Sequence, residues 1–226
     1  MPLAASLRAL LGHALDLIYP PRCLGCGAFG RWLCPSCLAG AERLEQPLWV
    51  ATGQSAEGTV LPVWSYGRHE GVLRESVHRL KYQDAMALAE PIAALMAAAG
   101  RSVSARADAL VAVPLHRRRE RERGYNQSRL LARHLGALIG LPLVEGQLLR
   151  LRDTPSQVHM SSEERLANVS GAFEASVELR DRRVVLVDDV CTSGATLLAC
   201  AEAVASVGGK AVAALTFTRA LPGAAP

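Results

Sequence analysis

Residues 184–196 constrain the fold more than any other part of the chain, reading Val-Val-Leu-Val-Asp-Asp-Val-Cys-Thr-Ser-Gly-Ala-Thr. The apolar run Val184–Val187 predicts a buried strand, and its carboxyl end presents Asp188 and Asp189 to an open crevice. Small residues then lead into an alanine- and leucine-rich helix, whose first N–H groups and partial positive charge suit a phosphate. We therefore expect an α/β sheet that carries a ligand site at one edge.

The two acids favour ligand groups that donate hydrogen bonds, and the loop that follows them favours groups that accept them. Carboxylates accept hydrogen bonds, whereas the hydroxyls of Thr192, Ser193 and Thr196 can donate them, and Gly194 lets the backbone approach a ligand closely. A sugar phosphate satisfies both halves, and each charge-assisted bond to it contributes about 1.5–3 kcal/mol. Magnesium sites in other α/β proteins share the order of strand, acid pair, loop and helix, so a metal site is one alternative, and an ordinary strand end with polar residues is the other.

This segment resembles the signature of type I phosphoribosyltransferases, which bind phosphoribosyl pyrophosphate (PRPP). The resemblance implies that Asp188 and Asp189 contact the ribose hydroxyls, that they are the candidate catalytic residues, and that magnesium accompanies PRPP. The phosphate would lie against the loop residues Cys191, Thr192, Ser193, Gly194, Ala195 and Thr196. Cys191 departs from the pattern of many members, but its backbone N–H can still serve the phosphate. The motif by itself leaves open whether the site is catalytic.

Four of the six cysteines form two Cys-x2-Cys pairs, separated by seven residues: Cys23, Cys26, Cys34 and Cys37. In a reducing compartment this pattern predicts metal ligation rather than disulfides. Four thiolates close a tetrahedral site, which is typical of structural zinc. An iron–sulfur cluster and a redox dithiol pair are the alternatives. About fifty residues make a poor core, so zinc would contribute about 10 kcal/mol to folding this module.

Composition places the chain among globular proteins, with 226 residues, 50% hydrophobic and 20% charged. The formal net charge of +4 is compatible with phosphate ligands or nucleic acid. The longest apolar run, Met86–Ala99, is interrupted by Glu90 and Pro91, so we expect no membrane span. The first residues lack a secretory layout, which favours a cytoplasmic protein.

Alternating strands and helices predict a parallel sheet flanked by helices, preceded by a small zinc module. We expect an N-terminal helix and zinc-binding module at residues 1–45 and the main domain at 46–226. The expected strands are 59–66, 109–113, 184–187 and 211–217. The expected helices are 1–18, 71–82, 85–99, 117–139 and 193–207, with a connecting loop at 46–58.

A second candidate ligand element follows the strand that ends at Pro114. In phosphoribosyltransferases the loop after this strand holds pyrophosphate, so the resemblance assigns Pro114 and Leu115 to that role. Five arginines and two glutamates occupy residues 117–123. Most of 117–121 fits a solvated helix face with Arg/Glu pairs. Arg123 and Asn126 are the better candidates for ligand contacts, because Gly124 breaks the charged run beside them.

Residues 150–173 form a polar stretch with little periodicity, and they include Gln157. In the resembling enzymes a mobile hood covers the reacting sugar here, and Gln157 would then contact the substrate. An ordinary surface loop is the alternative, although loops of this length are often functional.

The order of these motifs along the chain resembles the ComF family of competence-type proteins. The shared features are the four-cysteine module, 80–82 (Leu-Lys-Tyr), 113–115 (Val-Pro-Leu), 123–127 (Arg-Gly-Tyr-Asn-Gln), 154–157, 165–168 and the phosphate loop. The resemblance implies a zinc ribbon, a phosphoribosyltransferase-like domain and a role in DNA uptake and natural transformation. The alternative is a non-catalytic adaptor in single-stranded DNA transfer that docks a helicase or channel protein. No motif selects an acceptor substrate.

Overall fold

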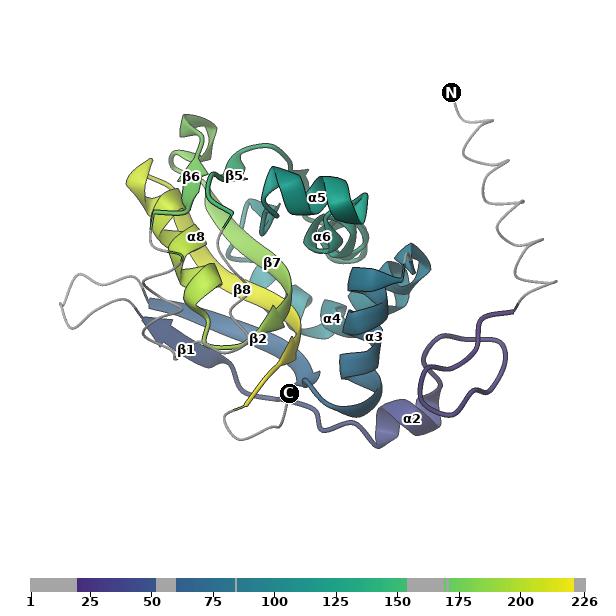
Figure 1. Cartoon of the computed structure of the whole chain (residues 1–226). Helices are drawn as coiled ribbons and strands as arrows, with labels where there is room; N and C mark the ends of the chain where they lie inside the picture. The colour runs from purple at the N-terminus through teal and green to yellow at the C-terminus, as the bar shows by residue number, and fades with distance from the viewer. Residues whose placement is uncertain (1–19, 52–59, 84, 154–168, 170, 222–226) are drawn as a thin grey trace, which may run out of the picture.

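A six-stranded sheet organises the main part of the chain, in the order β1-β2-β8-β7-β3-β4 (Figure 1). The computed structural model describes residues 20–51, 60–83, 85–153, 169 and 171–221, so the expected helix at 1–18 and Gln157 lie outside the described residues. The strands are β1 (Leu48–Ala51), β2 (Val60–Arg68), β3 (Ala109–Ala112), β4 (Leu143–Val144), β7 (Arg183–Cys191) and β8 (Lys210–Arg219).

The sheet is mixed rather than wholly parallel. Strands β2, β8, β7, β3 and β4 pair in parallel, as expected, but β1 pairs antiparallel with β2 at the edge. The prediction of a loop over 46–58 was wrong at β1. Only residues 52–59 separate β1 from β2, which is too short for the crossover that a parallel neighbour needs.

Helices cover both faces of the sheet (Figure 1). On one face lie α3 (Gly71–Tyr82), the short helix η1 (Met86–Leu88), α4 (Ala89–Ser104) and α6 (Gln127–Ile139). On the other lie α8 (Ala195–Ser206), the short helix η2 (Val177–Leu179) and a small sheet of β5 (Leu148–Arg150) with β6 (Phe173–Ala175). Alternate residues of β7 enter the two cores, because successive side chains of a strand point to opposite faces.

The helix expected over 117–139 is two helices, α5 (Arg117–Arg123) and α6. Gly124 ends α5 in the left-handed conformation, with φ of 82°. Asn126 then begins α6, and its side-chain oxygen accepts hydrogen bonds from the N–H groups of Ser128 and Arg129. Glycine tolerates positive φ and asparagine is a strong N-cap, so this pair of residues ends one helix and begins the next.

The N-terminal module packs on the face that holds α3. It contains the short helix α2 (Pro35–Ala39), and its Leu33 is buried in the same core as Leu73 and Val77 of α3. Trp32 and Leu38 pack against this core from the side. The module therefore rests on the helix whose other end reaches the candidate site.

One stretch, Met86–Ser104, is long and apolar enough to cross a membrane by length and composition. It is 44% buried within the protein, and α4 contributes Ile92 and Met96 to the core beneath the sheet. Burial of this kind is typical of a core helix, and the described residues contain no other candidate span.

Candidate functional site

The acid pair lies where β7 extends past the end of the neighbouring strand β3. Pairing between β3 and β7 ends with Ala112 opposite Val187, whereas pairing between β7 and β8 continues to Cys191 opposite Arg219. Asp188 and Asp189 therefore sit within the strand, beyond the end of β3. A crevice at the carboxyl edge of a parallel sheet is the usual ligand position in such folds.

The two acids bind different partners because neighbouring residues of a strand face opposite ways. Asp189 is 3% exposed, and its Oδ1 lies 3.1 Å from Nζ of Lys81 at the end of α3. Asp188 Oδ1 accepts a 2.7 Å hydrogen bond from the hydroxyl of Ser128 in α6. Asp189 Oδ2 is buried and has no hydrogen-bond partner among the described residues. A buried acceptor left in this state costs about 1–3 kcal/mol, so the site has an acceptor available for a ligand.

Burial controls the charge of the pair. It raises the pKa of Asp188 to about 7, with help from the charge of Asp189 and against the Ser128 hydroxyl and Lys81. Burial alone would lower the pKa of Lys81, but the charges of Asp189 and Asp188 outweigh it and raise that pKa. Lys81 therefore stays protonated and neutralises one of the two acids.

His69 adjoins this group from the end of β2. Its Nδ1 lies 2.8 Å from the hydroxyl oxygen of Thr218, on the neighbouring strand β8. Burial and then the charge of Lys81 lower the pKa of His69 to about 4, so the imidazole is neutral near pH 7. Neither His69 nor Ser128 carried a sequence signal, since both act through neighbours that are distant along the chain.

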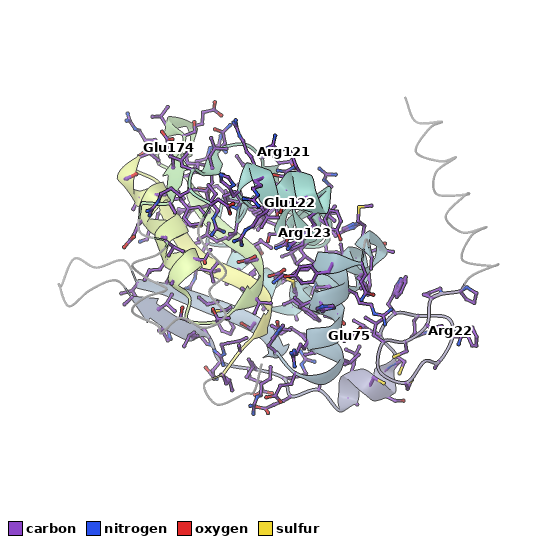
Figure 2. All side chains as sticks on the ribbon, viewed as in Figure 1. Arg22, Glu75, Arg121, Glu122, Arg123 and Glu174 are labelled. Carbon is purple, nitrogen blue, oxygen red and sulfur yellow. The ribbon has the colours of Figure 1, made fainter. Side chains whose placement is uncertain are left out.

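Two segments that resemble motifs of the ComF family, 80–82 and 123–127, contact each other beside the acids. The hydroxyl of Tyr125 donates to the backbone oxygen of Leu80, and the guanidinium of Arg123 lies 5.2 Å from the ring centroid of Tyr82. Figure 2 shows Arg123 nearer to α3 than its labelled neighbours of α5 are. Arg123 also donates to the side chain of Gln127. The contacts of Tyr125 and Arg123 tie the end of α3, which carries Lys81, to the segment that joins α5 to α6.

The predicted pyrophosphate segment borders a cavity of about 360 Å³. Pro114, Leu115 and Asn126 line it together with residues of α5 and β5. Both ends of the Asn126 amide are bonded within the protein: Nδ2 donates to the oxygen of Val113 at 3.0 Å, and Oδ1 accepts from the N–H of Ser128 at 2.9 Å. Asn126 thus ties the end of β3 to the start of α6, next to the serine that holds Asp188.

Most of the charged run 117–121 forms ion pairs. Arg118 lies 2.9 Å from Glu122 one turn later, as expected of a solvated helix face. Arg119 Nε lies 3.2 Å from Asp153, and Arg118 is 3.7 Å from the same carboxylate. Asp153 therefore fixes the start of the predicted hood to α5.

The predicted phosphate loop joins β7 to α8. Gly194 caps the helix with φ of 79°, and the Ser193 hydroxyl oxygen accepts from the N–H of Ala195 at 3.4 Å. Thr192 is exposed, whereas Cys191 is buried, and burial raises the pKa of its thiol to about 12. A neutral thiol does not repel an anion, so the departure at Cys191 leaves the loop suited to phosphate. Thr196 lies in the first turn of α8.

The four cysteines of the N-terminal module converge as expected. Their Sγ atoms all lie within 4.8 Å of one another, and those of Cys26 and Cys34 are 3.6 Å apart. Tetrahedral zinc bonded to sulfur at about 2.3 Å requires sulfurs about 3.8 Å apart, so the set fits zinc. The N–H of Cys34 donates to the sulfur of Cys23. Burial raises the pKa of the Cys23 thiol, but backbone N–H groups bring it down to about 6, whereas the neighbouring Cys34 side chain raises the pKa of Cys37 to about 12.

Comparison with known proteins matches both parts of the chain. The family model for the phosphoribosyl transferase domain matches residues 81–224, and that for the double zinc ribbon domain matches residues 14–62. The zinc ribbon match and the cysteine cluster together support structural zinc.

Curated relatives come from bacteria. The chain is 33% identical over 150 residues to the DNA utilization protein YhgH of Salmonella typhimurium, covering 64% of this chain and 66% of the relative. It is 38% identical over 93 residues to Competence protein F of Haemophilus influenzae, covering 40% and 41%. The matches thus span about two fifths to two thirds of these relatives. Adenine phosphoribosyltransferase from Thermoanaerobacter pseudethanolicus aligns at 13% identity and a TM-score of 0.35, covering 77% of this chain and 95% of that one.

Proposed function

Since this chain belongs to the phosphoribosyl transferase domain family and is a homologue of Competence protein F, we propose that it binds PRPP or a related ribose 5-phosphate. The ligand would lie along the carboxyl end of β7 and the start of α8. The observation that carries the proposal is the buried Asp189 oxygen with no partner among the described residues, beside Asp188 and next to a glycine-capped helix start. One end of the site accepts hydrogen bonds and the other donates them.

The acid pair suits sugar hydroxyls. Near pH 7 Asp188 is about half protonated, so the two acids and the Lys81 ammonium together carry less than one net negative charge. The pair suits hydroxyl donors, because carboxylate oxygens accept hydrogen bonds and have none to donate when ionised. Ser128 orients Asp188 and Lys81 orients Asp189, so both acids are positioned before the ligand arrives.

The loop from Cys191 to Thr196 suits the 5-phosphate. A helix of the length of α8 leaves N–H groups without intrahelical partners at its start, and its dipole favours a dianion there. Pyrophosphate would extend toward Pro114 and Leu115, where the cavity of about 360 Å³ begins. Magnesium, when bound, would neutralise the pyrophosphate oxygens.

A phosphoribosyl transfer at this site would form a bond between an acceptor and C1 of the ribose. The C1–O bond would break, and pyrophosphate would leave with its electron pair. Positive charge that develops on the ring would be stabilised by Asp188 and Asp189. The relatives' names add a link to DNA use and competence, which we propose for this chain as its cellular setting.

Calorimetric titration with PRPP and magnesium tests the proposal on matched variants. Asp188→Asn should weaken binding at least about tenfold, as expected for loss of a charge-assisted hydrogen bond. Asp108→Asn is the control, because Asp108 pairs with Arg183 at the opposite end of β7, 3.0 Å apart. Its affinity should match the parent. Absence of parent binding at about 1 mM PRPP, or equal affinities of Asp188→Asn and parent, would refute the proposal.

A second candidate function, contact with single-stranded DNA as a transfer adaptor, is favoured by one observation. Tyr82 is 66% exposed and Phe29 is 62% exposed, and each ring carries an arginine guanidinium over its face, Arg123 and Arg22 respectively. Exposed rings with cationic neighbours can stack bases. Single-strand binding that falls steeply with salt, and falls again in Tyr82→Ala but not in Asp188→Asn, would support this function. Binding that is indifferent to Tyr82 would count against it.

A further inference from the structure

Val50, in the strand that follows the zinc module, touches the predicted phosphate loop. Val50 is the only buried residue of β1, at 7% exposed, while its neighbours Trp49 and Ala51 are both exposed. A methyl group added at Gly194 would overlap Cγ1 of Val50 and lie 3.2 Å from its Cβ. The side chain of Val50 therefore rests directly on the backbone of Gly194.

Gly194 is the residue at which this contact matters most. It has φ of 79° and caps α8, so it sets the direction in which the first N–H groups of the helix point. A left-handed residue has few alternatives that keep both the strand before it and the helix after it in place. A small shift of Gly194 would redirect every donor that a bound phosphate uses.

The position of β1 makes this contact unusual. Among the described residues the strand pairs only with β2, with Val50 opposite Leu61, and it forms the antiparallel edge of the sheet. Figure 1 shows α8 beginning close to β1, and the two elements are in contact. The strand also falls inside residues 14–62, which match the double zinc ribbon domain. An element of the N-terminal match thus reaches the phosphate loop of the C-terminal one.

We propose that Val50 is a positioning residue that holds Gly194, and with it the phosphate loop, in the conformation that binds ligand. The inference rests on the proposed binding of a ribose 5-phosphate at this loop. It extends that proposal by making the strand after the zinc module part of the binding site. Val50 itself contacts no ligand and acts through the backbone of Gly194.

The first test combines Val50→Ala with a matched control, Val63→Ala. Val63 is fully buried in β2, where it pairs with Leu48, and its truncation removes the same atoms. Val50→Ala should weaken PRPP binding about tenfold, while Val63→Ala should leave affinity within about twofold despite a comparable loss of stability. Val50→Thr keeps the branched shape and should bind like the parent. Equal affinities of Val50→Ala and Val63→Ala would overturn the proposal.

A double-mutant cycle tests the contact itself. Gly194→Ala should weaken PRPP binding, because its methyl collides with Val50 and its φ is unfavourable for alanine. Val50→Ala in the same chain relieves the collision, so the double variant should bind several-fold tighter than independent effects would give. If the two losses of PRPP affinity simply multiply in the double variant, the two residues do not act together. Should Val50→Ala fail to fold, Val50→Cys, which has one γ atom where valine has two, serves in both tests.

Hydrogen exchange separates this proposal from the proposed function. In the ligand-free protein, Val50→Ala should speed exchange about tenfold relative to Val63→Ala at residues 198–201, the first hydrogen-bonded N–H groups of α8, of which that of Leu198 donates to the oxygen of Gly194. If exchange is faster there but the parent binds no PRPP, the proposal that PRPP is the ligand is refuted and the positioning role of Val50 is retained. Unchanged exchange at these residues, with PRPP bound by the parent, would refute the positioning role alone.

Discussion

Replacement of Asp188 by asparagine should stabilise the ligand-free protein at high pH. Burial, and then the charge of Asp189, raise the pKa of Asp188 from 3.8 to about 7. An acid with a higher pKa in the folded chain binds its proton more tightly there, so its contribution to stability is lost as the pH rises from about 4 to about 7. Asparagine does not ionise, and its side-chain oxygen can still accept from Ser128.

The size of the effect follows from the pKa difference. A change from 3.8 to about 7 corresponds to about 4 kcal/mol at pH 8. Lys81 partly neutralises the charge of Asp189 that helps to raise this pKa, so we expect about 2 kcal/mol for the single replacement. Near pH 4 the carboxyl is protonated in the folded chain, and the variant and the parent should differ by less than about 0.5 kcal/mol.

Urea unfolding at about pH 4.5 and at about pH 8 measures this difference. Acid also weakens thiolate–zinc bonds, but it does so equally in the variant and the parent, so the comparison between them is unaffected. The same variant should bind PRPP more weakly, which would show that this acid is kept for its ligand at the expense of stability. A variant that is less stable than the parent at pH 8, or one with the same difference at both pH values, would refute the reasoning.

Three further outcomes follow from the contacts. Lys81→Met should destabilise the fold by about 3 kcal/mol in urea, because it leaves Asp189 buried and unpaired, and adding Asp189→Asn should restore most of that loss; a double variant as unstable as the single one would contradict this. Cys26→Ser should lower bound zinc below one per chain by elemental analysis and lower the melting temperature, and iron in the parent would contradict the assignment. Asn126→Ala should cost about 2 kcal/mol in urea because it removes a helix cap and the bond to Val113, whereas Asn126→Asp should keep the cap and cost less.

Local pattern was enough to predict most of the elements. The helix expected over 71–82 has the bounds of α3, and the expected strands at 59–66, 109–113 and 211–217 match β2, β3 and β8 within a few residues. These segments have clear periodicity and polar or glycine boundaries, which depend on neighbours in sequence. The cysteine cluster was equally predictable, because metal-ligand spacing is itself a local pattern.

Edge strands and helix breaks were harder to predict. β1 is four residues long with one buried side chain, so it has almost no periodicity, and it exists because β2 offers an edge to pair with. The break at Gly124 did carry a signal, a glycine followed two residues later by a strong N-cap. The continuous charged and apolar pattern around it favoured a single helix.

The sequence by itself determined that residues 184–196 form a strand, a polar loop and a helix start, and that four thiolates meet in the first part of the chain. It did so because the periodicity of apolar side chains and the spacing of metal ligands depend on residues close together in the chain. Only the tertiary structure decided that Lys81 neutralises Asp189, that Ser128 holds Asp188, and that Val50 supports Gly194. Those contacts join residues far apart in sequence, and packing of the helices and the edge strand against β7 and α8 brings them together.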